Sequence, residues 1–133
     1  MPDAIYALLA SPFHLWDYAP THGQLLFRSL PVPERAHNVD IIFRGVTRLH
    51  VPDRLEGLEI AVVPALPEPL AASEGFALRV DARHFQLRED RGTCWYLNAM
   101  CFGVYHNRLA TLETSLNRYD WGDLGELKLW YAD

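Results

Sequence analysis

The chain has 133 residues, of which half are hydrophobic and 12% aromatic, and its formal net charge is -5. This hydrophobic content excludes intrinsic disorder, and the length fits a single domain over residues 1–133 with a substantial core. The negative charge repels nucleic-acid phosphates and anionic lipid headgroups, so we expect neither a nucleic-acid nor a membrane partner.

Alternation of hydrophobic and polar residues with period two predicts β-strands along most of the chain. We expect turns at 19–23 and 89–92, a proline-bearing loop at 31–35, a loop at 52–57 and a longer surface connection at 64–75. The predicted strands cover 13–18, 24–29, 39–51, 58–63, 76–88, 93–106 and 126–131, with a bend or bulge at Gly45 in the third.

One segment departs from the strand pattern. Leu109, Leu112, Leu116 and Tyr119 are spaced like the buried stripe of a short helix, with Thr111 as its cap. The remaining elements follow one another as hairpins, with little room for crossover helices. The sequence therefore predicts a mainly β fold, an antiparallel sheet or sandwich of about seven to eight strands with at most one short helix near 109–119.

The first candidate binding surface lies on the hairpin of residues 13–29. If Tyr18 pairs with Gln24, then His14, Trp16, Tyr18 and Arg28 share one face, while the other face is apolar. Large aromatic side chains with polar tips suit a binding patch or a cleft. The alternative is that Trp16 covers a second layer of the core.

The second candidate surface is the outward face of the strand over 39–51. Pairing of this strand with 58–63 would place His50 opposite Glu59, a contact that could raise the imidazole pKa. A face that mixes charged and apolar side chains is also typical of protein interfaces, although an ordinary solvated face remains the alternative. Its members are Asp40, Ile42, Arg44, Val46, Arg48 and His50.

The third candidate lies in the hairpin over 76–106, where we expect His84 to face Leu97 on the inner side. There it would be a hydrogen-bonded core residue, or else a general base at a pocket mouth. Cys94 and Cys101 would fall on opposite faces of one strand, which disfavours a disulfide and indicates a reducing compartment. The chain start has no basic region of the kind found in signal peptides, and no apolar run approaches eighteen residues. A cytoplasmic protein is therefore expected.

Linear catalytic and cofactor motifs are absent from the sequence. His14, Asp17 and His22 are the nearest approach to a metal site. Two of them leave a strand from opposite faces, so we expect no metal and no cofactor.

These observations favour a non-enzymatic binding or assembly module, whose partner is another protein or a second copy in a homodimer. Two alternatives stay open. One is a small-molecule-binding or hydrolytic domain that uses His14, Tyr18 and Arg28 in a cleft. The other is an acidic protein that neutralises a basic toxin through carboxylates such as Asp40 and Glu59.

Overall fold

A computed structural model describes residues 3–72, 78, 81–116 and 125–132. Nine antiparallel strands form one sheet, which confirms the predicted mainly β fold. Two short 3-10 turns, η1 (Pro20–His22) and η2 (Leu70–Ala72), are the helical elements of this part of the chain. The strands are β1 (Tyr6–Ala19), β2 (Gln24–Ser29), β3 (Asn38–Arg44), β4 (Arg48–His50), β5 (Arg54–Val63), β6 (Arg83–Arg88), β7 (Cys94–Ala99), β8 (Cys101–Asn107) and β9 (Glu126–Tyr131).

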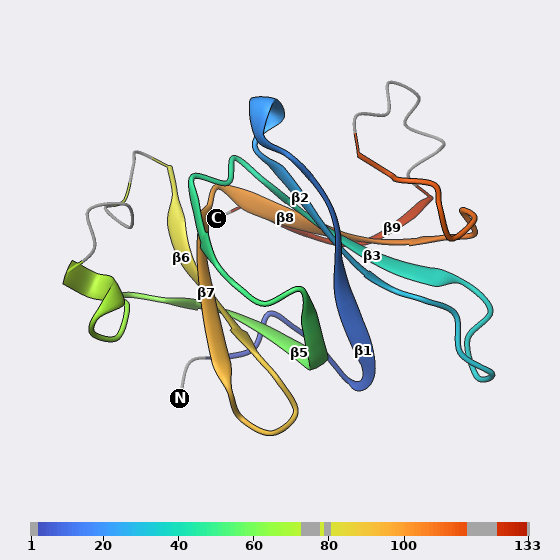
Figure 1. The fold of residues 1–133 in the computed structure, drawn as a ribbon, viewed down its shortest axis with the longest axis horizontal. Coiled ribbons are helices and arrows are strands. Elements are labelled where there is room, and N and C mark those ends of the chain that lie inside the picture. Colours follow the sequence, from blue (N-terminus) through green and yellow to red (C-terminus); the bar gives the residue numbers. More distant parts are fainter. Residues whose placement is uncertain (1–2, 73–77, 79–80, 117–124, 133) are drawn as a thin grey trace.

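The strand order is β4-β7-β6-β5-β1-β2-β3-β8-β9, and the sheet curls so that distant strands in this order meet (Figure 1). β3 continues into β4 through a bend at Gly45, whose φ is 67°. β7 continues into β8 through Met100. Two backbone hydrogen bonds join the bends: Met100 N–H donates to the Arg44 carbonyl, and Thr47 N–H donates to the Asn98 carbonyl. The predicted strands over 39–51 and 93–106 are thus each two strands with a bend between them.

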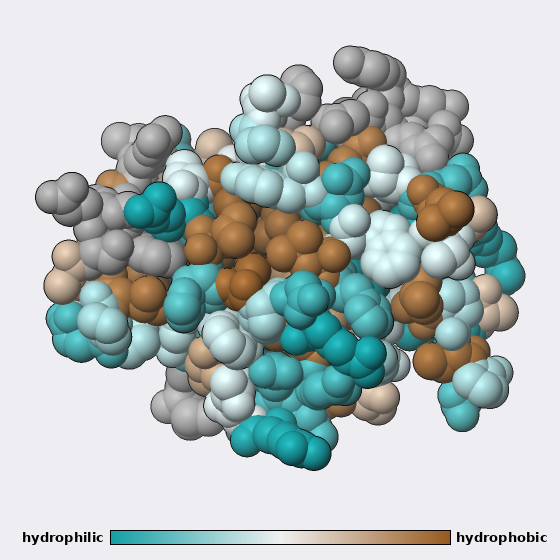
Figure 2. Space-filling model, viewed as in Figure 1, coloured by the Kyte–Doolittle hydropathy of each residue, from teal (hydrophilic) through white to brown (hydrophobic). Residues whose placement is uncertain are grey.

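The main core lies on the inner, concave face of the sheet. It follows from the alternating pattern, since most strands place apolar residues at alternate positions. On the face drawn in Figure 2, hydrophobic residues gather near the middle of the molecule and hydrophilic ones lie around them. Phe43 of β3 packs its ring against Phe85 of β6 and Phe102 of β8, at centroid distances of 5.4 and 5.3 Å. Burial of one such ring stabilises the fold by about 1.5–3 kcal/mol. These cross-sheet contacts hold the curled shape.

A second, smaller core covers the outer face of the central strands. Leu26 of β2 and Ile42 of β3 pack there with Tyr105 and Leu116, and Trp16 lies against them. β2 and β3 are therefore buried on both faces. The expectation that Trp16 covers a second core layer is confirmed. Ile42 lies on the outer face as expected, but it is buried there and is not part of an exposed surface.

The segment expected to form a helix does not do so. Residues 109–116 run irregularly across the outer face, and 117–119 lie outside the described residues. The apolar stripe fails because its members do not share an environment: Leu116 is buried, while Leu112 is 97% exposed. Hydrogen bonds to the sheet, described below, determine the path of this segment instead.

Bulges explain the errors in predicted register within the first hairpin. His14 pairs with Arg28 as expected, but a bulge at Trp16 shifts the remaining pairs, so that Tyr18 faces Leu25. A second bulge lies in β1 between Leu8 and Pro12, opposite Gly57 of β5. Gly57 has a φ of 86°, and a side chain there would meet the carbonyl oxygen of Leu9 at 2.5 Å. Only glycine fits this position without strain.

Two other predicted pairings are also wrong. Thr93 closes the turn, since Glu89 N–H donates to its carbonyl. The strand pairing is therefore one residue off, and His84 faces Asn98 instead of Leu97. His50 faces Tyr96, because β4 pairs with β7 and not with β5.

Within the described residues, no helix is long and apolar enough to cross a membrane.

Candidate functional site: a buried polar cluster and the loop that it holds

The most unusual feature of the outer face is an ion pair with no solvent exposure. Arg28 of β2 and Asp40 of β3 are directly opposite in the sheet, and both are 0% exposed. Arg28 Nε donates to Asp40 Oδ1 at 2.7 Å, and its Nη2 donates to Oδ2 at 2.8 Å. This two-point geometry is the strongest that an arginine and a carboxylate can form.

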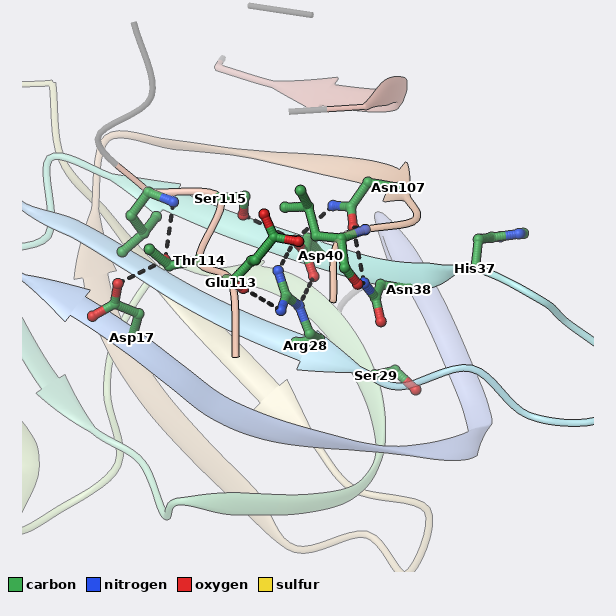
Figure 3. Close-up of polar contacts among 12 residues, drawn as sticks. Asp17, Arg28, Ser29, His37, Asn38, Asp40, Asn107, Glu113, Thr114 and Ser115 are labelled. Atoms are coloured by element: carbon green, nitrogen blue, oxygen red, sulfur yellow. Dashed lines mark hydrogen bonds and ion pairs between the residues drawn. The ribbon is translucent and has the colours of Figure 1, made fainter. Parts of the chain in front are cut away.

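Residues far away in the sequence complete the coordination of this pair (Figure 3). Asn107 Nδ2 and Ser115 Oγ donate to Asp40 Oδ2 at 2.7 and 2.9 Å. Arg28 Nη1 donates to the carbonyl of Glu113 at 2.6 Å. The Asp40 carboxylate therefore accepts four hydrogen bonds, which compensates for its removal from water.

A second set of bonds fixes the loop that lies over the ion pair. We call residues 108–116 the outer loop. Asn38 Nδ2 donates to the carbonyl of Leu109 and to Oδ1 of Asn107, both at 2.9 Å. At the other end of the loop, Thr114 Oγ1 donates to Asp17 Oδ2 at 2.6 Å. The outer loop is thus attached to β1, β2 and β3 through directional contacts along its length.

The tip of the outer loop is a tight turn. Glu113 N–H donates to the Ala110 carbonyl at 2.9 Å, and the Glu113 carboxylate accepts from Ala110 N–H at 2.8 Å. Leu112 stands at this turn and is 97% exposed. A loop whose backbone is held by hydrogen bonds therefore presents a highly exposed apolar side chain.

Strand β9 carries two further exposed apolar side chains. Leu127 pairs with Tyr105, and Trp130 pairs with Gly103, so both lie on the outer face. Their exposed fractions are 51% and 47%. Tyr105 lies across Gly103, where an added Cβ would sit 2.8 Å from its ring. The outer face near β9 therefore carries two exposed apolar side chains beside the buried ring of Tyr105.

The four predicted residues of the first hairpin do not line one open cleft. Arg28 is buried in the polar cluster, and its guanidinium lies 5.4 Å from the Trp16 ring. His14 makes an edge contact with Trp16 at 6.2 Å and is partly buried. Tyr18, at 40% exposure, is the accessible member. A ligand could reach Tyr18, but it could not reach Arg28 without displacing the outer loop.

The second predicted surface is split between two strands. Arg44 ends β3 and is partly buried, whereas Arg48 and His50 of β4 are exposed. The His50 ring contacts Trp95 at 5.7 Å. Asp40, expected to face outward with them, is instead the centre of the buried cluster, because the outer loop covers that part of β3. An acidic contact surface would therefore lack this carboxylate.

The third candidate, His84, is partly buried, and its Nδ1 lies 2.6 Å from Oδ1 of Asn98. The ring nitrogen thus has a hydrogen-bond partner on the neighbouring strand, as expected of a histidine with a structural role. Both cysteines are free thiols, and burial raises the pKa of Cys101, which makes it a weak nucleophile. The residues that the structure describes contain no group of three or more His, Cys, Asp or Glu side chains placed to hold a metal ion.

Sequence reasoning missed most of the polar cluster. Asn38, Asn107, Glu113 and Ser115 gave no motif, because they converge only after β3 and β8 pair. The available sequence signal for the cluster was the position of Arg28 and Asp40, each on the polar side of a strongly hydrophobic strand. Opposite charges at facing positions of neighbouring strands favour that pairing.

Comparison with known proteins adds no precedent for this arrangement. No family model, curated protein or solved structure matches the chain. Its function is therefore argued from geometry.

Proposed function

We propose that this protein is a non-enzymatic binding module that assembles with a second copy of itself through the outer face at β9 and the outer loop. The observation that carries the proposal is the exposure of three large apolar side chains in these two elements, Leu112, Leu127 and Trp130. Exposed apolar side chains beside a fixed backbone are typical of contact sites between proteins.

The position of β9 favours a second copy as the partner. β9 ends the strand order, so one of its backbone edges has no neighbouring strand among the described residues. An unpaired edge is a template for another strand. Pairing of two β9 strands about a two-fold axis would continue the sheet and bring Leu127 and Trp130 of both copies together.

The net charge and the free cysteines support the class of partner and the cellular location that this proposal assumes. A net charge of -5 favours a protein partner over nucleic acid. Free Cys94 and Cys101 support a reducing, cytoplasmic location.

The oligomeric state is the direct test. We expect sedimentation velocity from low to high micromolar concentration to show a monomer–dimer equilibrium. Replacement of a central interface aromatic typically costs about 2 kcal/mol or more, so Trp130→Ser should weaken the dimer by roughly 30-fold. Leu78→Ser is a matched control, because Leu78 is 48% exposed and belongs neither to β9 nor to the outer loop.

Two results would refute the proposal. One is a monomer throughout the concentration range. The other is a dimer that Trp130→Ser and Leu78→Ser weaken equally, since the contact would then not be specific to β9.

A further inference from the structure

A separate polar pocket lies at one end of the inner face, where β3 begins, β8 ends and β9 begins. The rings of His37 and His106 stack there, with centroids 4.2 Å apart and an angle of 27° between their planes. His106 is directly opposite Val39, and Val39 belongs to the main core. The two imidazoles therefore cover the end of the core and line a hollow of about 220 Å³.

The groups around this hollow are mainly cationic. Arg108 and Lys128 line it, together with Asn107 and Glu126. Arg35 also acts on both imidazoles, and Glu126 is the one acidic side chain among the described residues that does so. Lys128 Nζ is bonded to Glu126 at 2.8 Å. A chain of net charge -5 thus lines this hollow with two fixed cations, two histidines and, among the described residues, a single carboxylate, and Arg35 acts on both imidazoles as a third cation.

One polar atom in this cluster is unsatisfied. Nε2 of His37 is buried and has no hydrogen-bond partner among the residues that the structure describes. Buried polar atoms in proteins nearly always have one, so this ring nitrogen needs an explanation such as a bound ligand. It belongs to the imidazole that stacks on His106, which is itself a lining residue of the hollow.

We infer that this pocket binds a small tetrahedral oxyanion, either free phosphate or the phosphate group of a monoester. Arginine and lysine side chains are the usual partners of such a group, and a protonated imidazole adds an N–H donor. The hollow has room for one phosphate with a short substituent. The chemistry of the lining, in which cations outnumber acids, also excludes a metal cation as the natural occupant.

The electrostatics of the pocket are consistent with this occupant. Burial lowers the pKa of both imidazoles, and Arg35 and Lys128 lower it further, against an opposite effect of Glu126. Arg108 also lowers the pKa of His37, and His37 lowers that of His106. Tyr6 of β1 interacts electrostatically with Arg35, but burial raises the pKa of its hydroxyl, so Tyr6 adds no charge at neutral pH. A bound anion would reverse the repulsion between the cations and favour protonation of both rings.

NMR titration of the histidine C–H resonances tests the inference directly. Inorganic phosphate, methyl phosphate and malonate are added separately against chloride at constant ionic strength. We expect saturable shifts at His37 and His106 with phosphate or methyl phosphate, and a higher pKa for both rings when the anion is bound. Saturation by inorganic phosphate alone would indicate the free anion, whereas tighter binding of methyl phosphate would indicate a monoester.

A pair of variants separates this site from general charge attraction. Arg108→Gln removes a lining cation that forms no ion pair shorter than 4 Å in the described structure, and should weaken phosphate binding about tenfold. Arg91→Gln removes the same charge from an exposed turn elsewhere and should leave binding unchanged. Both positions are exposed, so thermal unfolding should report intact folds.

Three outcomes would overturn the inference: no saturable shift at either ring, stronger binding of malonate than of phosphate, or equal affinity in Arg108→Gln and Arg91→Gln. The test is independent of dimer formation, since Trp130→Ser should bind phosphate like the unmodified chain.

Discussion

The buried ion pair allows a quantitative test of what holds the outer loop. Replacement of Arg28 by methionine removes the partner of Asp40 but leaves the carboxylate inside the protein. Breaking a buried pair in this way costs about 3–5 kcal/mol, because one buried charge loses its compensation. The Glu113 carbonyl also loses its donor. Against a typical total of about 5–15 kcal/mol for a domain, this variant should lose a large part of its stability.

A double-mutant cycle separates the pair from its surroundings. Arg28→Met with Asp40→Leu removes both charges, so the penalty of an uncompensated charge disappears. The double variant still leaves the donors of Asn107 and Ser115 without the carboxylate. We therefore expect it to be less stable than the original chain, yet more stable than the sum of the single variants predicts, by about 2 kcal/mol.

Urea unfolding followed by tryptophan fluorescence is the appropriate measurement, since the Trp16 ring lies 5.4 Å from the Arg28 guanidinium. Ser115→Ala provides a graded comparison: it removes one of four donors to Asp40 and should cost about 1 kcal/mol. Arg54→Gln breaks an exposed ion pair with Glu56 and should leave the unfolding midpoint unchanged. The reasoning would be refuted if the changes in unfolding free energy of the two single variants were additive. It would also be refuted if Arg28→Met lost no more stability than Ser115→Ala.

Two further predictions concern other parts of the fold. Gly57→Ala should destabilise the protein by about 1–3 kcal/mol through backbone strain, and further through the close contact of the new Cβ with Leu9. Gly92→Ala, at a similar φ of 93° but in open space, should show the effect of strain alone. Equal decreases in melting temperature for the two variants would contradict the role of the Leu9 contact. Since burial and His37 lower the pKa of His106 below its ordinary 6.5, the unfolded chain binds more protons below that pH, and stability should fall as pH drops from about 6.5 toward the folded-state pKa. His106→Gln should flatten this part of the stability–pH curve; an unchanged curve would contradict the assignment.

Local patterning was sufficient to predict several strands with few errors. β2 and β9 occupy the predicted ranges 24–29 and 126–131, because each has a turn or loop signal before it and clear alternation within it. The split of residues 39–51 into β3 and β4 was harder to see. Gly45 indicated a bend, but its consequence, pairing of the two halves with β8 and β7, depends on contacts that no local pattern encodes.

The polar cluster shows a different limit. Alternation placed Arg28 and Asp40 correctly on the face opposite the main core, and from this the sequence suggested that both meet water. The outer loop covers them because Asn107, Glu113 and Ser115 supply matching donors and acceptors. Leu109, Leu112 and Leu116 gave a helical spacing, and the directional hydrogen bonds of this cluster outweigh that weak preference. A polar face predicted to be solvated was therefore a buried one.

The same cluster connects stability to the proposed contact surface. Two apolar side chains in place of Arg28 and Asp40 would still fill the space under the outer loop. Apolar packing is not directional, however, and would not hold the loop in a single position relative to the sheet. Leu112 would then be ordered only on binding, at an entropic cost that the present structure avoids. The Arg28→Met, Asp40→Leu variant should therefore form a weaker dimer although β9 and Leu112 are unchanged. If its dimer is as strong as that of the original chain, the outer loop does not contribute to the contact, and β9 alone carries it.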